Sequence, residues 1–269
     1  MSEPLPDDFA AALASSAARR GAFGQSVVFQ SSTRSTNDIA QALAEGGAPQ
    51  GAVALAFAQT AGRGRQGREW FSPPGAGIYM SVVVRSPAAA PMLTLAGGVA
   101  VADGIRRATG LPVFIKWPND VVVEDAHAPG RRRKLAGILA EGTTSQNGLQ
   151  HVVLGIGINV RPADYPPELA ARVTSLEHEL GRAVDGGLVL SEILVALNEQ
   201  VTVLEAGLSQ QLLSRWRALA PSATGTNVSW NDHGVMVRGM TAGIDQQGAL
   251  LIRTGPDVQR VISGEVCWD

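Results

Sequence analysis

Apolar side chains are grouped along this chain in runs of two lengths. Three short runs, at residues 52–58, 77–85 and 152–160, are almost continuously apolar and are bounded by turn residues. A short run of this kind is typical of a strand that is buried on both faces. Longer segments with helical spacing lie at residues 91–109 and 188–207. The pattern therefore predicts a core of buried strands with long helices between them.

The pattern changes after Pro221, where short strands alternate with turns. These strands are expected at residues 226–230, 234–244, 248–253 and 258–266. Closely spaced strands with polar turns are typical of a small β-barrel. We therefore divide the chain into an N-terminal extension, a large domain and a small C-terminal domain, at residues 1–24, 25–220 and 221–269.

A polar segment, STRSTN, connects the strand expected at residues 27–30 to a helix expected at residues 38–45. Ser35, Thr36 and Asn37 are all suitable residues for the N-cap of that helix. Capping needs only one of them, so the other polar groups are free for a ligand at the helix N-terminus.

Composition excludes several classes of protein. The 269 residues carry a net charge of -2 with 45% hydrophobic residues, whereas nucleic-acid-binding domains usually have an excess of basic residues. The single cysteine, Cys267, cannot form an intramolecular disulfide, and the four histidines lack metal-ligand spacing. No apolar run is judged to approach the ~20 residues that a membrane helix requires, so no membrane helix is expected. We expect a cytoplasmic protein that does not bind a membrane.

The strongest functional signal is the segment QTAGRGRQGREW at residues 59–70, which directly follows a buried strand. Its glycines let the backbone approach a ligand closely, and its arginines offer planar donor pairs that match phosphate or carboxylate. The segment is neither a P-loop nor a dinucleotide-binding loop, because no helix follows it. A specific anion site and a mobile basic loop that binds RNA nonspecifically both remain open at this point.

Two further segments carry candidate chemistry. KWPND, at residues 116–120, ends in residues that favour a turn, and KLAGIL, at residues 134–139, begins the second arm of an expected hairpin. Lys134 stands where the chain becomes apolar, so its amine is expected near the sheet. The arginines at residues 131–133 are interpreted as a solvated loop tip.

Taken together, these motifs resemble the biotin protein ligase family. The matching segments, which keep one order and spacing, are STN (35–37), QTAGRGRQGREW (59–70), KWPND (116–120), KLAGIL (134–139), GIGIN (155–159) and RW (215–216). The resemblance implies an α+β fold with a mixed-sheet catalytic domain similar to class II aminoacyl-tRNA synthetases and a small SH3-like C-terminal barrel. It also implies a reaction that joins biotin to ATP as biotinyl-5′-AMP and transfers biotin to a lysine of a biotin carboxyl carrier domain.

The resemblance assigns the biotin site residue by residue. Hydroxyl and amide groups suit the neutral ureido head of biotin, which both donates and accepts hydrogen bonds. The loop is expected to be disordered without ligand and to fold over biotin or its adenylate. The residues expected to bind biotin are Ser35, Thr36, Asn37, Gln59, Gly62, Arg63, Gly64, Arg65, Lys134, Gly137 and Leu139.

The resemblance also assigns the nucleotide and the catalytic groups. Lys134, Arg65 and Arg68 are expected to be catalytic, with the lysine opposing negative charge at the reacting carboxylate and α-phosphate. Asp120 is the expected ligand of Mg²⁺, which accompanies ATP as a cofactor. For Trp70, Asn119 and Trp216 a structural role and direct contact are both open. The residues expected at ATP are Arg65, Arg68, Trp70, Lys116, Asn119, Asp120 and Asn159.

Several expectations concern partners and rivals. About twenty-five residues precede the first strand, so we expect a monofunctional ligase without the DNA-reading domain of bifunctional members, and no specific DNA partner. Arg34 replaces an acidic residue that often precedes STN, and SGEVCWD ends earlier than the related family motif. A monomer and a homodimer are equally compatible with the sequence. The rival functions are a lipoate or octanoate ligase or transferase of the same fold group and a DNA- or RNA-binding protein.

Overall fold

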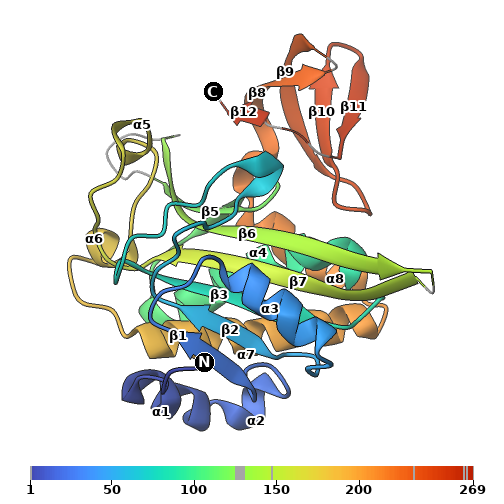
Figure 1. Cartoon of the computed structure of the whole chain (residues 1–269). Helices are drawn as coiled ribbons and strands as arrows, with labels where there is room; N and C mark the ends of the chain where they lie inside the picture. Colours follow the sequence, from blue (N-terminus) through green and yellow to red (C-terminus); the bar gives the residue numbers. More distant parts are fainter. Residues whose placement is uncertain are drawn as a thin grey trace.

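The structure, a computed structural model, describes residues 2–124, 131–146, 148–232, 234–262, 264 and 266–268. A seven-stranded sheet forms the centre of the larger part of the molecule (Figure 1). Its strand order is β1-β2-β3-β7-β6-β5-β4. The first pair is parallel and the others are antiparallel, so the expected mixed sheet is confirmed. The strands are β1 (Val27–Gln30), β2 (Val53–Ala56), β3 (Gly77–Val84), β4 (Phe114–Lys116), β5 (Asp120–Glu124), β6 (Arg132–Ser145) and β7 (Gly148–Asn159).

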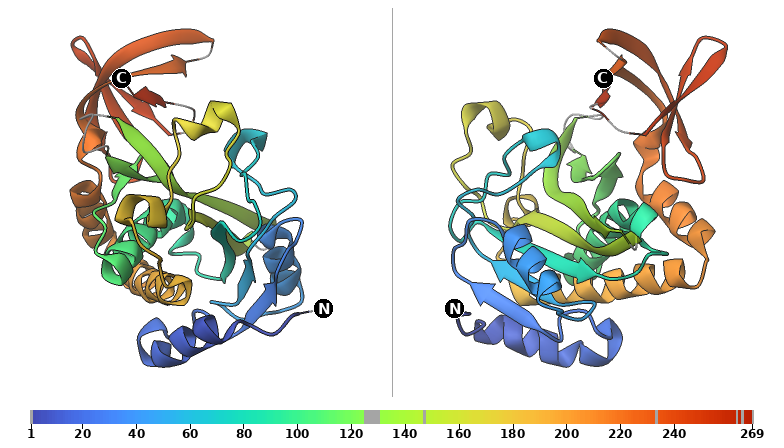
Figure 2. Two further views of the ribbon diagram at one scale, coloured as in Figure 1. Left: turned by 90° about the vertical axis from the view of Figure 1, so that its left-hand side faces the viewer. Right: turned by 45° about the vertical axis from the view of Figure 1, so that its right-hand side comes forward.

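Helices cover both faces of this sheet, which is why β3 is buried along its whole length. On one face, α3 (Thr36–Glu45) packs on β2, β3 and β7 through alanines such as Ala40 and Ala44. On the other face, α4 (Leu93–Thr109) packs on the sheet and on α7 (Gly186–Glu205), as the views of Figure 2 show. The remaining helices are α1 (Asp7–Ser15), α2 (Ala17–Arg20), α5 (Pro167–Ala170), α6 (Leu176–Leu180) and α8 (Ser209–Leu219).

The N-terminal segment packs on the core of the large domain. Phe9 and Leu13 of α1 are buried, and α1 and α2 both contact α7. Gly21, which follows α2, has a φ of 53°, a conformation that glycine adopts without steric cost. Gly21 therefore ends the helical N-terminal segment, which consists of the two helices α1 and α2.

The longest helix changes one expectation about membranes. By length and composition alone α7 could cross a membrane, with a mean hydropathy of 1.5 over an 18-residue window. The expectation that no apolar run approaches that length is wrong for this segment. In the fold, 67% of that window is buried, and α7 contacts α4, α1, α2 and α8. Its apolar composition is explained by this burial in the core.

The C-terminal part forms a separate five-stranded antiparallel sheet, which confirms the expected small β domain. Its order is β11-β10-β9-β8-β12, from β8 (Thr224–Asp232), β9 (Val235–Ile244), β10 (Leu250–Thr254), β11 (Asp257–Val261) and β12 (Val266–Trp268). One strand was expected at residues 258–266, and that expectation is wrong. The chain crosses from one edge of the sheet to the other between β11 and β12, so a single strand cannot pair with both β10 and β8.

Candidate active site

One pocket, with a volume of about 340 Å³, collects almost every predicted site residue. Its floor is formed by β6 and β7, and the loop between β2 and β3 covers it. The predicted residues that line it are Ser35, Thr36, Asn37, Gln59, Arg63, Gly64, Arg65, Arg68, Trp70, Lys116, Asn119, Asp120, Lys134, Gly137, Leu139 and Asn159. Gly62 does not line it; a Cβ there would lie 2.5 Å from the carbonyl oxygen of Trp70, so its place is explained by backbone packing.

Neutral polar groups occupy one end of the pocket. Ser35 is the N-cap of α3, with its Oγ accepting from the amide of Asn37 at 3.3 Å. The helix therefore begins at Thr36, two residues earlier than expected. The Thr36 amide and hydroxyl both donate to Gln59 Oε1, at 2.8 and 3.2 Å. Ser81 Oγ of β3 lies within hydrogen-bonding distance of Asn37 Oδ1 and of Thr36 Oγ1, which joins the cluster to the sheet.

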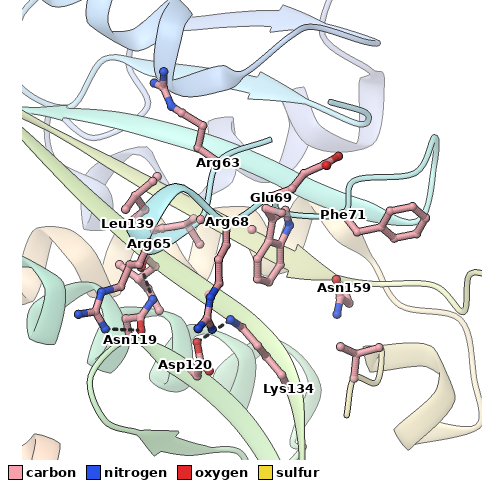
Figure 3. A pocket seen from close by; sticks show the side chains of 18 of the residues that line it. Arg63, Arg65, Arg68, Glu69, Phe71, Asn119, Asp120, Lys134, Leu139 and Asn159 are labelled. Atoms are coloured by element: carbon pink, nitrogen blue, oxygen red, sulfur yellow. Dashed lines mark hydrogen bonds and ion pairs between the residues drawn. The ribbon is translucent and has the colours of Figure 1, made fainter. Parts of the chain in front are cut away.

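Arg63 points away from the centre of the pocket. Its guanidinium forms ion pairs with Asp38 of α3 at 2.7 Å and with Glu141 of β6 at 3.1 Å. Glu141 also accepts a hydrogen bond from the Asn37 side chain. Figure 3 shows Arg63 directed to the opposite side from Arg65 and Arg68. In this conformation Arg63 fastens the loop to α3 and β6.

Charged groups gather at the other end of the pocket. Lys134 Nζ lies 2.6 Å from Asp120 Oδ1, and Arg65 donates to Asn119 Oδ1 at 3.2 Å. The side chains of Arg68, Lys134 and Asp120 meet at this point (Figure 3). Burial lowers the pKa of Arg65, opposed by the carboxylate of Asp120 and reinforced by the charge of Arg68. The site therefore gathers several cations around one carboxylate.

Trp70 lies against two glycines of the sheet. A Cβ on Gly157 would lie 2.5 Å from its Nε1, and one on Gly137 would lie 2.6 Å from its Cζ3. Lys134 Nζ lies 4.9 Å from the centroid of the indole ring, within the range of a cation–π interaction. The glycines of GIGIN and KLAGIL are thus needed for the indole, and the indole in turn places the lysine.

Three predicted residues have clear structural roles. Asn159 is buried and donates to the carbonyl of Thr174 at 3.0 Å, and Asn119 donates to the carbonyl of Ile138 at 2.8 Å. Trp216 is fully buried in the core. Arg215 itself pairs with Asp103 of α4. For Trp216 the structural alternative is therefore confirmed.

Sequence reasoning missed part of the pocket wall. The segment after β7 contributes Tyr165, Leu169 and Arg172 to the wall, and none of the three was predicted. Tyr165 packs against Phe71 with ring centroids 5.8 Å apart, and burial raises its pKa. Arg132 also lines the pocket, so the interpretation of residues 131–133 as a solvated tip is wrong for it. The link at residues 125–130 lies outside the described residues.

A mixed sheet covered by a basic glycine loop forms a pocket with neutral polar groups at one end and cations at the other, which suits a ligand with a neutral polar part and an anionic part. Comparison with known proteins identifies the class of protein as a ligase. Residues 29–159 match the model of the biotin/lipoate A/B protein ligase family. The bifunctional ligase/repressor BirA of Bacillus subtilis is 33% identical over 90% of this chain and 74% of its own length.

Two further proteins are similar to this chain over most of its length. The biotin–[acetyl-CoA-carboxylase] ligase of Mycobacterium tuberculosis is 36% identical, over 87% of this chain and 85% of its own. The structure of the biotin protein ligase from Aquifex aeolicus in complex with biotin and ATP has a TM-score of 0.76 and 26% identity, covering 91% of this chain and 99% of the other. The chain belongs to the biotin/lipoate A/B protein ligase family.

Proposed function

We propose that this protein is an ATP-dependent biotin protein ligase that forms biotinyl-5′-AMP and transfers biotin to a lysine of a biotin carboxyl carrier domain. The observation that carries the proposal is the division of one pocket into two ends. Thr36 and Gln59 lie at the neutral end, and Lys134, Arg65 and Arg68 lie at the cationic end. Relatives named as biotin ligases support biotin over lipoate as the substrate.

The chemistry follows from this division. A biotin carboxylate oxygen attacks the α-phosphorus of ATP, the bond to the bridging oxygen breaks, and its electron pair leaves with pyrophosphate. Lys134 opposes the charge that develops on the phosphoryl oxygens, and Arg65 and Arg68 add to the same field. The carrier lysine then attacks the acyl carbon, AMP leaves, and the amine loses a proton to solvent.

The side chains at the cationic end could hold Mg²⁺ only together with the phosphates of the nucleotide. Asp120 offers one hard carboxylate, and Mg²⁺ is commonly held by one or two carboxylates together with substrate phosphates. Within the described ranges no group of three or more His, Cys, Asp or Glu could hold an ion by itself. When bound, Mg²⁺ would neutralise phosphate charge next to Asp120.

The test is a reaction of the purified protein with ATP, Mg²⁺, biotin and a carrier domain, followed by mass spectrometry. The expected result is one added biotin on one carrier lysine. A carrier variant with that lysine changed to arginine is the control and should stay unmodified. Transfer of lipoate or octanoate and no transfer of biotin would contradict the proposal.

Other features of the proposal concern location and partners. We place the ligase in the cytoplasm as a monomer or homodimer, and its single cysteine agrees with a reducing compartment. We also propose that it binds no specific DNA, as its net charge of -2 suggests. A sequence-specific complex in a gel-shift experiment would refute that part. Folding of the loop on ligand binding stays a prediction.

A further inference from the structure

Beyond Lys134, the pocket wall carries cations from three separate segments. Lys116 ends β4 and lies opposite Asp120 in the β4–β5 register. Arg132 is two residues before Lys134 on β6, so both side chains face the pocket, whereas Arg133 points elsewhere and pairs with Glu179. Arg172 lies beside Lys134, whose amide donates to the Arg172 carbonyl at 2.8 Å.

Among the residues that the structure describes, acidic groups do not balance these charges. Asp120 is already bonded to Lys134. Arg132 reaches only Glu124, at 3.5 Å, and the guanidinium of Arg172 has no ion-pair partner within the part of the chain that the structure describes. The pKa of Lys116 is lowered by burial; Asp120 opposes the shift, and the charges of Arg172, Arg132 and Lys134 add to it. The described residues of the wall therefore carry an excess of positive charge directed into the pocket.

Trp268 of the C-terminal sheet holds two of these cations together. Lys116 Nζ and Arg132 Cζ each lie 5.9 Å from the centroid of its indole ring. A cation over an aromatic face is attracted by the ring quadrupole, which partly offsets the repulsion between like charges. The two cations are thus placed before any ligand arrives.

We propose that Arg132 and Arg172, together with Lys116, form a subsite for the pyrophosphate that leaves during adenylation. The proposal rests on the proposed ligase function. If Lys134 marks the α-phosphate and the neutral groups mark the biotin head, the β- and γ-phosphates must extend along the remaining wall. Planar guanidinium groups suit them, because each can bind two phosphate oxygens at once.

The subsite acts on the bond that breaks. As the bond between the α-phosphorus and the bridging oxygen opens, its electron pair becomes negative charge on the pyrophosphate. Arg132 and Arg172 oppose that charge, so the leaving group departs more readily. The same contacts hold pyrophosphate for the reverse reaction, and its apparent affinity therefore reports on the subsite directly.

The experiment compares Arg132→Met, Arg172→Met and the double variant with Arg131→Met. Methionine keeps an apolar stem of similar length, and Arg131 is an exposed neighbour that does not line the pocket. Biotin-dependent exchange of labelled pyrophosphate into ATP gives the half-saturating pyrophosphate concentration. Transfer from chemically supplied biotinyl-5′-AMP to the carrier domain is measured separately.

Each single variant is expected to raise the half-saturating pyrophosphate concentration about tenfold, because it loses about one charge-assisted hydrogen bond. The double variant is expected to raise this concentration further. Transfer from the supplied intermediate should stay within about twofold of the unaltered protein. The Arg131 control should change neither value. Since Arg172 is exposed, its variant carries the test even if Arg132→Met folds poorly.

Two results would overturn the inference and leave the ligase function standing. Unchanged pyrophosphate saturation in the variants would show that these arginines do not contact the leaving group. Slower transfer with unchanged pyrophosphate saturation would show that they serve an acidic face of the carrier domain instead. Failure of exchange in the unaltered protein would refute the ligase function and the subsite together, and so is distinguished from failure of the subsite alone.

Discussion

At the scale of single residues, the position of Lys134 is set by two contacts. Its amine lies 2.6 Å from Asp120 and 4.9 Å from the Trp70 ring centroid. Lys134→Ala removes the charge that opposes the developing phosphoryl charge, so adenylate formation should slow about 100-fold or more. Biotin affinity should fall much less, because the neutral groups at Thr36 and Gln59 are untouched. Single-turnover adenylation and calorimetric biotin binding measure the two effects.

A normal adenylation rate in Lys134→Ala would show that the lysine is not at the reacting centre. Its thermal midpoint should be recorded as a control for folding. Equal losses in biotin affinity and in rate would assign Lys134 to ground-state binding.

The buried charge of Lys116 is expected to lower the stability of the fold. Burial lowers the pKa of Lys116 in the folded protein below the ordinary 10.5. Below the folded-state pKa, the buried charged amine therefore reduces the free energy of unfolding by a constant amount. This loss becomes smaller as the pH rises from the folded-state pKa toward 10.5, because the amine then loses its proton in the folded protein. Lys116→Met should therefore raise the thermal midpoint at neutral pH by about 2 °C. The difference from the unaltered protein should narrow at alkaline pH, and the KM for ATP should rise. Calorimetry across pH measures the first effect, and a midpoint difference that widened with pH would contradict this account.

At the scale of elements, the contact between α4 and α7 depends on a small residue. A Cβ on Gly104 would lie 2.5 Å from Ile193 Cγ1 and 2.7 Å from the Ile193 backbone. Gly104→Ala should therefore force the two helices apart and cost about 1–3 kcal/mol of unfolding free energy. Denaturant unfolding is the measurement.

Gly98, on the same helix, is the matched control. A Cβ there meets Ile115 Cδ1 at 3.6 Å, an ordinary van der Waals distance. Gly98→Ala should be neutral or stabilise by up to about 1 kcal/mol, since alanine favours a helix over glycine. Equal destabilisation by both substitutions would show that helix packing does not distinguish the two positions.

At the scale of the whole molecule, the C-terminal sheet completes the site. Trp117 Nε1 donates to the carbonyl of Gly248 at 3.0 Å, and Trp268 contacts Lys116 and Arg132. Trp268→Leu should raise the KM for ATP several-fold, on the order of 0.5 kcal/mol for each of the two cation–π contacts, whereas Trp268→Phe should retain most of the affinity. Steady-state kinetics at saturating biotin tests this, and similar KM values for Leu and Phe would refute a role for the aromatic face.

The sequence by itself determined the buried strands, the site loop and the family. Continuous apolar runs mark strands covered on both faces, and the basic glycine loop with KWPND and KLAGIL marks the pocket, because these signals are local. The neighbours of each side chain were decided only by the tertiary structure. Strand pairing turns Arg132 into the pocket and Arg133 to Glu179, and helix packing buries Trp216. The direction of a side chain depends on segments far away in the sequence, which no local pattern contains.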